Sequence, residues 1–164
     1  TDGAACILLM NEGRAHTLGI PILGCVGEYA DAGFEPSRMG LGPVGAINKL
    51  LKKTGTSLKN FTTVEINEAF AVQVLACLKV MSSDVLTKKF FSTYGFEKAL
   101  GEVDDRRLNP NGGAIALGHP VGVSGMRLII TALKELERAG GESALISACI
   151  GGGQGNAMIL NRRS

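Results

Sequence analysis

Several features that mark common protein classes are missing from this chain of 164 residues. Tryptophan is absent, no two cysteines form a C-x-x-C pair, and histidines and cysteines do not cluster at the spacing of zinc ligands. No segment has the pattern of a signal peptide, and glycine, proline or asparagine interrupts the uncharged runs, so no membrane-spanning helix is expected. A P-loop, an internal repeat and low-complexity tracts are also missing. These absences exclude zinc-finger, transmembrane-helix and repeat proteins.

The composition is that of an ordinary globular domain. Hydrophobic residues make up 45% of the chain, charged residues 20%, and the net charge is +2. This charge is too small to indicate a nucleic acid or an anionic membrane as a partner. Glycine accounts for 23 residues, about twice the usual share of roughly 7%. The glycines lack a collagen period and therefore indicate turns and close backbone approaches.

The four cysteines are expected to be free thiols in a reducing compartment: Cys6, Cys25, Cys77 and Cys149. An intracellular location follows, with the cytoplasm preferred and an organelle as the alternative. The first residue is Thr1 rather than methionine, which suggests processing, a removed tag or a fragment.

Hydrophobic patterning predicts alternating strands and helices. The strands are expected at residues 4–10, 22–28, 63–66, 143–149 and 156–160, and the helices at residues 11–18, 44–53, 68–81 and 126–138. The helix over 68–81 is apolar almost all round and is expected to be buried. The alternation predicts one α/β domain over residues 1–164, with a mixed, mostly parallel sheet and helices on both faces. Residues 82–107 are expected to form a polar surface insert with a short helix, and the last two strands to pair antiparallel at one side of the sheet.

A glycine motif offers a first candidate site. Residues 40–45 read Gly-Leu-Gly-Pro-Val-Gly, which matches G-x-G-x-x-G at the start of a predicted helix, and Glu65 follows 20 residues later. The motif does not follow a strand directly, and Pro43 removes an amide that a pyrophosphate would need. The preferred interpretation is a loop that turns into a helix, and the alternative is an NAD or FAD site.

Asn67 lies where a predicted strand ends and a predicted helix begins. It could cap the helix, which asparagine does well. It could also direct its amide at a water or a substrate, because α/β sheets build sites at the carboxyl ends of their strands. The pattern does not decide between these two. Glu68 could serve as a first-turn charge that matches the helix dipole.

His119 lies in the glycine-rich stretch 112–125, which has no charged residue between Arg107 and Arg127. A neutral imidazole on a loop ahead of a helix can act as a base or as a hydrogen-bond donor. The alternative is a structural histidine with its hydrogen bonds satisfied in the core. The surrounding glycines favour a site, because small residues let a substrate come close.

Cys149 ends an apolar strand, and three glycines, Gly151 to Gly153, follow it closely. Glycine amides can point at an oxyanion with no side chain in the way. The alternative is a buried, inert cysteine. One cysteine and one histidine within reach of backbone donors suggest acyl-group chemistry.

Three segments together resemble the carboxyl-terminal half of the thiolases, the acetyl-CoA acetyltransferases and 3-ketoacyl-CoA thiolases. They are NEAFA at 67–71, NGGAIALGHPVGVSG at 111–125 and CIGGGQG at 149–155, in this order. The stretches TDGAACILLM and MGLGPVGAINKLLKKTG also resemble that family. The resemblance covers nearly the whole chain, and only residues 82–107 match weakly.

The resemblance implies an acyl-CoA acyltransferase that cleaves or forms a carbon–carbon bond between an acyl-CoA and acetyl-CoA. Coenzyme A thioesters would be its substrates, with no permanently bound cofactor and no metal. His119 would activate a nucleophilic cysteine and help to hold a thioester oxyanion. Cys149 would be the acid/base for the acetyl carbon. Asn67 would hold a water in one oxyanion hole, and the amide of Gly151 would be a donor in the other.

One part of the family pattern has no counterpart in this chain. The segment with the nucleophilic cysteine is absent, because Cys6 and Cys25 fall in predicted strands and Cys77 in a predicted helix. The resemblance therefore implies half of an enzyme, expected to pair with an amino-terminal half or with itself through an exposed apolar face. The alternative is a catalytically incomplete fragment that acts only in association.

Overall fold

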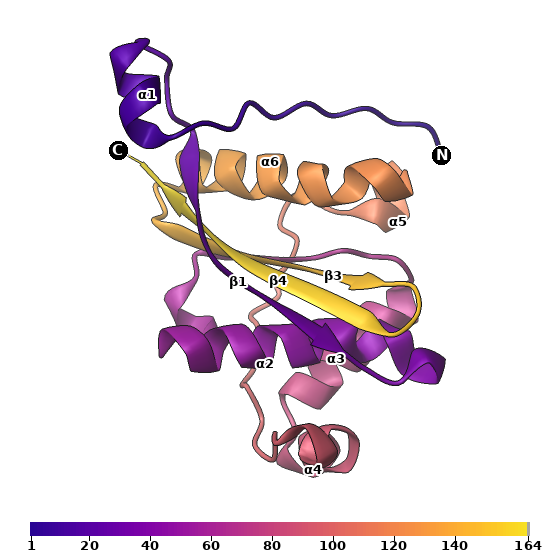
Figure 1. Ribbon diagram of the computed structural model, residues 1–164. Coiled ribbons are helices and arrows are strands. Elements are labelled where there is room, and N and C mark those ends of the chain that lie inside the picture. Colours follow the sequence, from indigo (N-terminus) through magenta and orange to yellow (C-terminus); the bar gives the residue numbers. More distant parts are fainter. Residues whose placement is uncertain (164) are drawn as a thin grey trace.

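The computed structural model describes residues 1–163, and within them four strands form one sheet between two helical layers (Figure 1). In chain order the elements are α1 (Glu12–Thr17), β1 (Gly24–Gly33), η1 (Pro36–Leu41), α2 (Gly42–Thr54), η2 (Leu58–Asn60), β2 (Thr63–Ile66), α3 (Ala71–Met81), α4 (Asp84–Phe91), η3 (Ser92–Tyr94), α5 (Ala114–Leu117), α6 (Val121–Ala139), β3 (Ser143–Ile150) and β4 (Gln154–Arg162), where η denotes a 3₁₀ helix. Helix α2 covers one face of the sheet and α6 the other. The predicted α/β fold with a mixed sheet and helices on both faces is confirmed.

The sheet is nevertheless less parallel than predicted. Its order is β1-β4-β3-β2, and among the described strands β2–β3 is the one parallel pair. The hairpin of β3 and β4 is antiparallel, as expected, but it occupies the middle of the sheet rather than one side. A tight turn forces this antiparallel pairing, and β1 then adds antiparallel to the remaining edge of β4. The short strand β2 alone continues the sheet in parallel.

The strand predicted at residues 4–10 is wrong. This segment is extended but belongs to no element, and Leu8 and Leu9 are 70% and 74% exposed. It runs along α6 (Figure 1), and a cavity of about 710 Å³ lies between the two, lined partly by Met10, Ile129 and Ile130. An apolar run becomes a strand only where a neighbour bonds its backbone, and within residues 1–163 no strand lies beside it.

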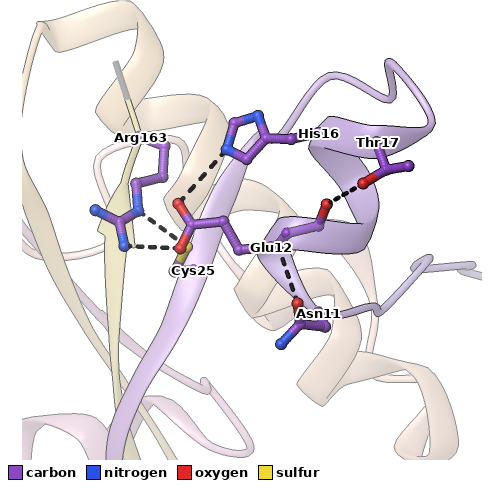
Figure 2. A network of polar contacts seen from close by, with 7 residues as sticks. Asn11, Glu12, His16, Thr17, Cys25 and Arg163 are labelled. Atoms are coloured by element: carbon purple, nitrogen blue, oxygen red, sulfur yellow. Dashed lines mark hydrogen bonds and ion pairs between the residues drawn. The ribbon is translucent and has the colours of Figure 1, made fainter.

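Polar contacts hold α1 against the ends of β1 and β4 (Figure 2). Asn11 caps the helix as predicted. Glu12 lies 3.1 Å from Arg163, whose Nε donates to the sulfur of Cys25 at 3.2 Å. His16 lies 3.9 Å from Glu12 on the same exposed surface. Exposed ion pairs contribute little stability, so this network mainly orients α1.

Helix α3 is buried on one face only, so the prediction of a fully buried helix is wrong. Val74, Cys77 and Val80 pack into the core. Val72 and Leu75 point outward and are 73% and 64% exposed. Periodicity cannot show whether both faces of an apolar helix find partners within one chain, and here the outer face is uncovered.

The segment 82–107 contains the predicted short helix, α4, but it is not wholly a surface excursion. Phe91 is 1% exposed and stacks on Phe34 with ring centroids 4.6 Å apart. Thr87 is also buried, and its hydroxyl donates to the carbonyl of Val80 at 2.8 Å. The charged residues of this segment led to the prediction of a surface insert, although Phe91 within it packs into the core.

Close backbone packing accounts for the G-x-G-x-x-G motif. No strand directly precedes it: the 3₁₀ helix η1 includes its first two residues and continues directly into α2, so a 3₁₀ turn takes the place of the predicted loop before the helix. Gly42 packs directly against the backbone of Gly155 on β4, and a Cβ on either residue would overlap the other's main chain. The glycines therefore let α2 approach the sheet.

A buried carboxyl group lies on β2 and faces the α6 layer. Glu65 is 1% exposed, and its Oε1 accepts no hydrogen bond from residues 1–163. Burial, with further contributions from the charges of Glu135 and Glu68, raises the pKa of Glu65 from 4.5 to about 8 despite the nearby Arg127. Glu65 is therefore mostly protonated at neutral pH in the folded chain.

This protonation predicts a pH-dependent stability. Between pH 4.5 and about 8 the folded chain keeps a proton on Glu65 that the unfolded chain releases. The free energy of unfolding therefore falls as pH rises through this interval, by roughly 1.4 kcal/mol per pH unit for one full proton. Glu65→Gln should remove this slope in urea denaturation, whereas Glu97→Gln at an exposed position should keep it. Parallel pH profiles for the native chain and Glu65→Gln would contradict the assignment.

The close contact between Gly42 on α2 and Gly155 on β4 predicts that a side chain at Gly155 lowers the stability of the fold. Gly155→Ala should lower the free energy of unfolding by about 1–3 kcal/mol, the usual range for overpacking a tight core. Gly33→Ala on β1 is the matched control, because its Cβ would meet no atom within 4 Å. Equal losses in the two variants, measured by urea denaturation, would show that the backbone contact is not limiting.

Candidate functional site

The parallel pairing of β2 with β3 brings two of the predicted site residues to one edge of the sheet. Ile66 is in register with Ser147, and the amide of Asn67 donates to the carbonyl of Ser147 at 2.8 Å. Asn67 follows β2 directly, and Cys149 is the penultimate residue of β3. Because the carboxyl ends of parallel strands share one edge, the Asn67 amide and the Cys149 thiol lie in the same region.

Asn67 does not cap a helix, so that alternative is wrong. Helix α3 begins only at Ala71, with Phe70 at the capping position. The side chain of Asn67 is 3% exposed, and its Oδ1 accepts no hydrogen bond from residues 1–163. An unpaired buried amide oxygen costs about 1–3 kcal/mol. Such an atom favours the second interpretation, an amide directed at a water or a ligand.

Cys149 is half-buried, and burial raises the pKa of its thiol. The thiol is therefore protonated at neutral pH and can act as a proton donor. Gly151 follows in the exposed turn between β3 and β4, and a Cβ there would meet no atom within 4 Å. Gly152 and Gly153 have φ angles of 86° and 87°, a left-handed backbone that suits glycine.

His119 lies on the loop between α5 and α6, as predicted, and is half-buried. Its Nδ1 lies 2.6 Å from the hydroxyl oxygen of Ser124, which in turn donates to the carbonyl of Pro120 at 3.2 Å. A ring with its proton on Nδ1 fits both contacts, since Nδ1–H then donates to Ser124 while the hydroxyl donates to Pro120. In the neutral ring this leaves Nε2 unprotonated and able to accept a proton.

Glu68 ties the loop of His119 to the end of β2. Its Oε2 accepts from the amide of Ile115, the second residue of α5, at 3.0 Å. Glu68 lies before the first turn of α3, so the predicted match to that helix dipole is wrong. Further along the loop, Arg127 donates to the carbonyl of Gly118 at 2.8 Å.

Sequence reasoning did not find Ser124 or Arg127. Both lie on α6, five and eight residues beyond His119. The helix after His119 could have drawn attention to them, but the pairing depends on how the chain turns at Pro120.

Of the other cysteines, Cys6 and Cys25 line the cavity beside the N-terminal arm, whereas the buried Cys77 on α3 is near enough to Cys149 for the two thiols to interact electrostatically. Cys6 is exposed on the N-terminal arm, Cys25 contacts Arg163, and burial raises the pKa of Cys77 to about 12. Within residues 1–163, no three side chains of the types His, Cys, Asp or Glu are grouped to bind a metal ion. In the same part of the chain, no helix combines the length and the apolar character needed to cross a bilayer.

This chain is similar in sequence to one protein family and to several of its enzymes. The family described as "Thiolase, C-terminal domain" matches residues 20–162. The chain is 43% identical to the acetyl-CoA acetyltransferase of Pseudomonas aeruginosa over 98% of its own length and 36% of that protein. It is 42% identical to a 3-ketoacyl-CoA thiolase of Aliivibrio fischeri, over 99% and 38% of the two chains. The chain thus spans little more than a third of these relatives.

Solved structures agree with the sequence relatives. Human mitochondrial 3-ketoacyl-CoA thiolase in complex with CoA matches with a TM-score of 0.75 and 41% identity, over 93% of this chain and 34% of the human one. The acetyl-CoA acetyltransferase of Bacillus anthracis matches with a TM-score of 0.78 and 36% identity, over 94% and 34%. The chain belongs to the thiolase family, and its match is to the C-terminal domain of that family.

Proposed function

We propose that this chain supplies the histidine and the acid/base cysteine of an acyl-CoA acyltransferase site. The observation that carries the proposal is the buried, unpaired Oδ1 of Asn67 at the same sheet edge as the thiol of Cys149. An amide oxygen kept free at the same end of the sheet as a protonated thiol suits a reaction that moves a proton and stabilises an oxyanion. In this proposal residues 1–164 act as one carboxyl-terminal domain.

Each of the four site residues has a defined part in the proposed reaction, and His119 has two. Nε2 of His119 accepts the proton of a cysteine thiol on an amino-terminal thiolase half, and the resulting thiolate attacks the acyl carbon. In the cleavage direction the Cys149 thiol gives its proton to the departing acetyl carbon, and in condensation the thiolate takes that proton back. A water held by Asn67, together with His119, stabilises one thioester oxyanion, and the amide of Gly151 stabilises the other.

Coenzyme A thioesters are the substrates in this proposal. The family membership supports this class, and the human mitochondrial relative was solved with CoA. Gly151 and Gly152 in the turn after Cys149 leave space for a substrate, since a Cβ at either would meet nothing within 4 Å.

The reaction needs a second half that supplies the nucleophile. Two apolar surfaces support an amino-terminal thiolase half as the partner. The first is the exposed arm with Leu8 and Leu9, which lies outside the matched range 20–162. The second is the outer face of α3 with Val72 and Leu75. Exposed apolar surfaces of this kind mark interaction sites, and self-association is the alternative way to cover them.

The catalytic roles can be tested in a chimera. Residues 1–164 would replace the matching segment of the Pseudomonas aeruginosa acetyl-CoA acetyltransferase, and thiolysis of acetoacetyl-CoA would be measured. Cys149→Ala should lower condensation by roughly 100-fold or more while acylation of the nucleophile stays measurable. His119→Ala should impair both half-reactions, because its Nε2 serves the nucleophile and the oxyanion.

Cys6→Ala is the matched cysteine control, because Cys6 is exposed on the N-terminal arm, and it should keep both half-reactions. Retained condensation with lost acylation in Cys149→Ala would reverse its assignment. Unchanged rates in His119→Ala would make it a structural histidine. An inactive chimera with native residues would refute the proposed function.

Association can be tested by sedimentation of the chain with the amino-terminal part of the same Pseudomonas enzyme. A complex of the two is expected, and Leu75→Ser on the outer face of α3 should weaken it at least about tenfold. Val85→Ser is the control, because Val85 is equally apolar and 76% exposed but lies on α4. A chain that stays monomeric at high concentration and binds no amino-terminal half would contradict the partner proposal.

A second candidate function is association without catalysis, favoured by the same exposed surfaces and by the absence of a nucleophile among the described cysteines. The discriminating measurement is acetoacetyl-CoA thiolysis by the reconstituted complex. Turnover that disappears in Cys149→Ala supports the enzyme, and a stable complex without turnover supports association alone.

A further inference from the structure

Asn109 lies beside β2, on the side away from β3, and forms hydrogen bonds with the backbone of this strand. Leu108 bridges to Val64 in parallel, and the amide of Asn109 donates to the carbonyl of Val64 at 3.0 Å. The backbone then turns away, with a φ of 41° at Asn109, a left-handed value that asparagine tolerates better than most residues. From there Oδ1 accepts from the amide of Ile66 at 2.8 Å, and Nδ2 donates to the carbonyl of Ile66 at 2.9 Å. One side chain thus bonds both backbone groups of the last residue of β2.

The same side chain continues to Glu68. Nδ2 of Asn109 also donates to Oε1 of Glu68 at 3.1 Å, while Oε2 of Glu68 accepts from the amide of Ile115 at 3.0 Å. The two oxygens of the carboxylate are therefore used by two different donors, which a carboxamide with its single oxygen cannot match. The backbone passes directly over this carboxylate at Gly113, where a Cβ would stand 2.6 Å from Cδ of Glu68.

These contacts connect the strand end of Asn67 with the loop of His119, and both residues belong to the proposed site. Glu68 adjoins Asn67, and Ile115 precedes His119 by four residues. We infer that Glu68, held by Asn109, is a positioning residue that sets the loop of His119 against the strand end of Asn67. This role rests on the proposed function, because it concerns the same site.

Other contacts of the loop reach a different element. Asn111 donates to Glu135 at 2.8 Å, and the carbonyl of Gly118 accepts from Arg127 at 2.8 Å, so both bonds hold the loop to α6. The pair of Asn109 and Glu68 holds it to β2. An error of about 1 Å in the placement of catalytic groups can cost about 100-fold in rate. The bonds to α6 do not set the distance between the loop and β2, whereas the bonds of Asn109 and Glu68 do.

The first experiment measures amide hydrogen exchange in the chain itself. Glu68→Gln keeps the shape of the side chain but loses one acceptor. Asn109→Gly keeps the left-handed backbone accessible and removes only the side-chain bonds. In both variants, exchange over residues 112–118 should rise at least about tenfold, while β3 and α2 keep their protection. Glu97→Gln, the same change at an exposed position, should leave the loop unchanged.

The second experiment measures catalysis in the chimera described above. Glu68→Gln should lower kcat about 10- to 100-fold with KM for acetoacetyl-CoA within about twofold, because the substrate still binds but His119 is displaced. Glu97→Gln should change neither constant. The thermal transition of Glu68→Gln should stay close to that of the native chimera.

The outcomes separate the two proposals. Unchanged exchange at 112–118 in both variants would overturn the positioning role. Exchange that rises equally in β3 and α2 would also overturn it, since Glu68 would then serve the stability of the whole domain. A native kcat in Glu68→Gln with a loosened loop would show that the loop's order does not serve catalysis. An inactive native chimera whose loop still loosens in Glu68→Gln would refute the proposed function and leave the structural link between Glu68 and the loop.

Discussion

The parallel pairing of β2 with β3 is the contact on which the site depends. The register of Ile66 with Ser147 places Asn67 and Cys149 at one edge of the sheet. Side chains alternate between the faces of a strand, so a slip of one residue would turn every side chain of β2 to the opposite face. Asn109 pairs with the outer edge of β2 at Val64 and Ile66. A strand of only four residues therefore keeps its register through partners on both edges.

The glycines of this chain serve separate physical purposes. Gly42 and Gly155 let a helix touch the backbone of the central hairpin, which is a matter of packing. Gly152 and Gly153 allow the left-handed turn after Cys149, which is a matter of backbone conformation. Gly113 gives room to the carboxylate of Glu68. The high glycine content therefore reflects several separate turns and close approaches, and a single glycine-rich motif does not explain it.

Local patterns predicted the elements that meet their partners within this chain. The buried face of α2, the parallel strand β2, the hairpin and the histidine ahead of α6 all follow from periodicity and turn residues. The predictions for residues 4–10 and for the outer face of α3 were wrong. Whether these apolar segments find a packing partner depends on surfaces outside the local sequence. The tie of Glu68 to Ile115 joins residues 47 positions apart, and no local pattern reports such a pair. The three site motifs were recognised by resemblance, whereas the register of β2 with β3 brings two of them, those of Asn67 and Cys149, to one end of the sheet.

In the proposed assembly, a single interface would cover the exposed apolar surfaces and also exclude water from the site. Cys149 is half-buried, and its thiol pKa is already raised by the burial that this chain provides. A second half placed over the sheet edge would remove more water and raise that pKa further, because desolvation disfavours the thiolate. The same covering would strengthen the hydrogen bonds of Asn67 and of the Gly151 amide to an oxyanion, since electrostatic interactions grow as water is excluded. In the proposed assembly association and catalysis would therefore be coupled, because the contact that buries the apolar faces would also complete the electrostatic environment of the thiol.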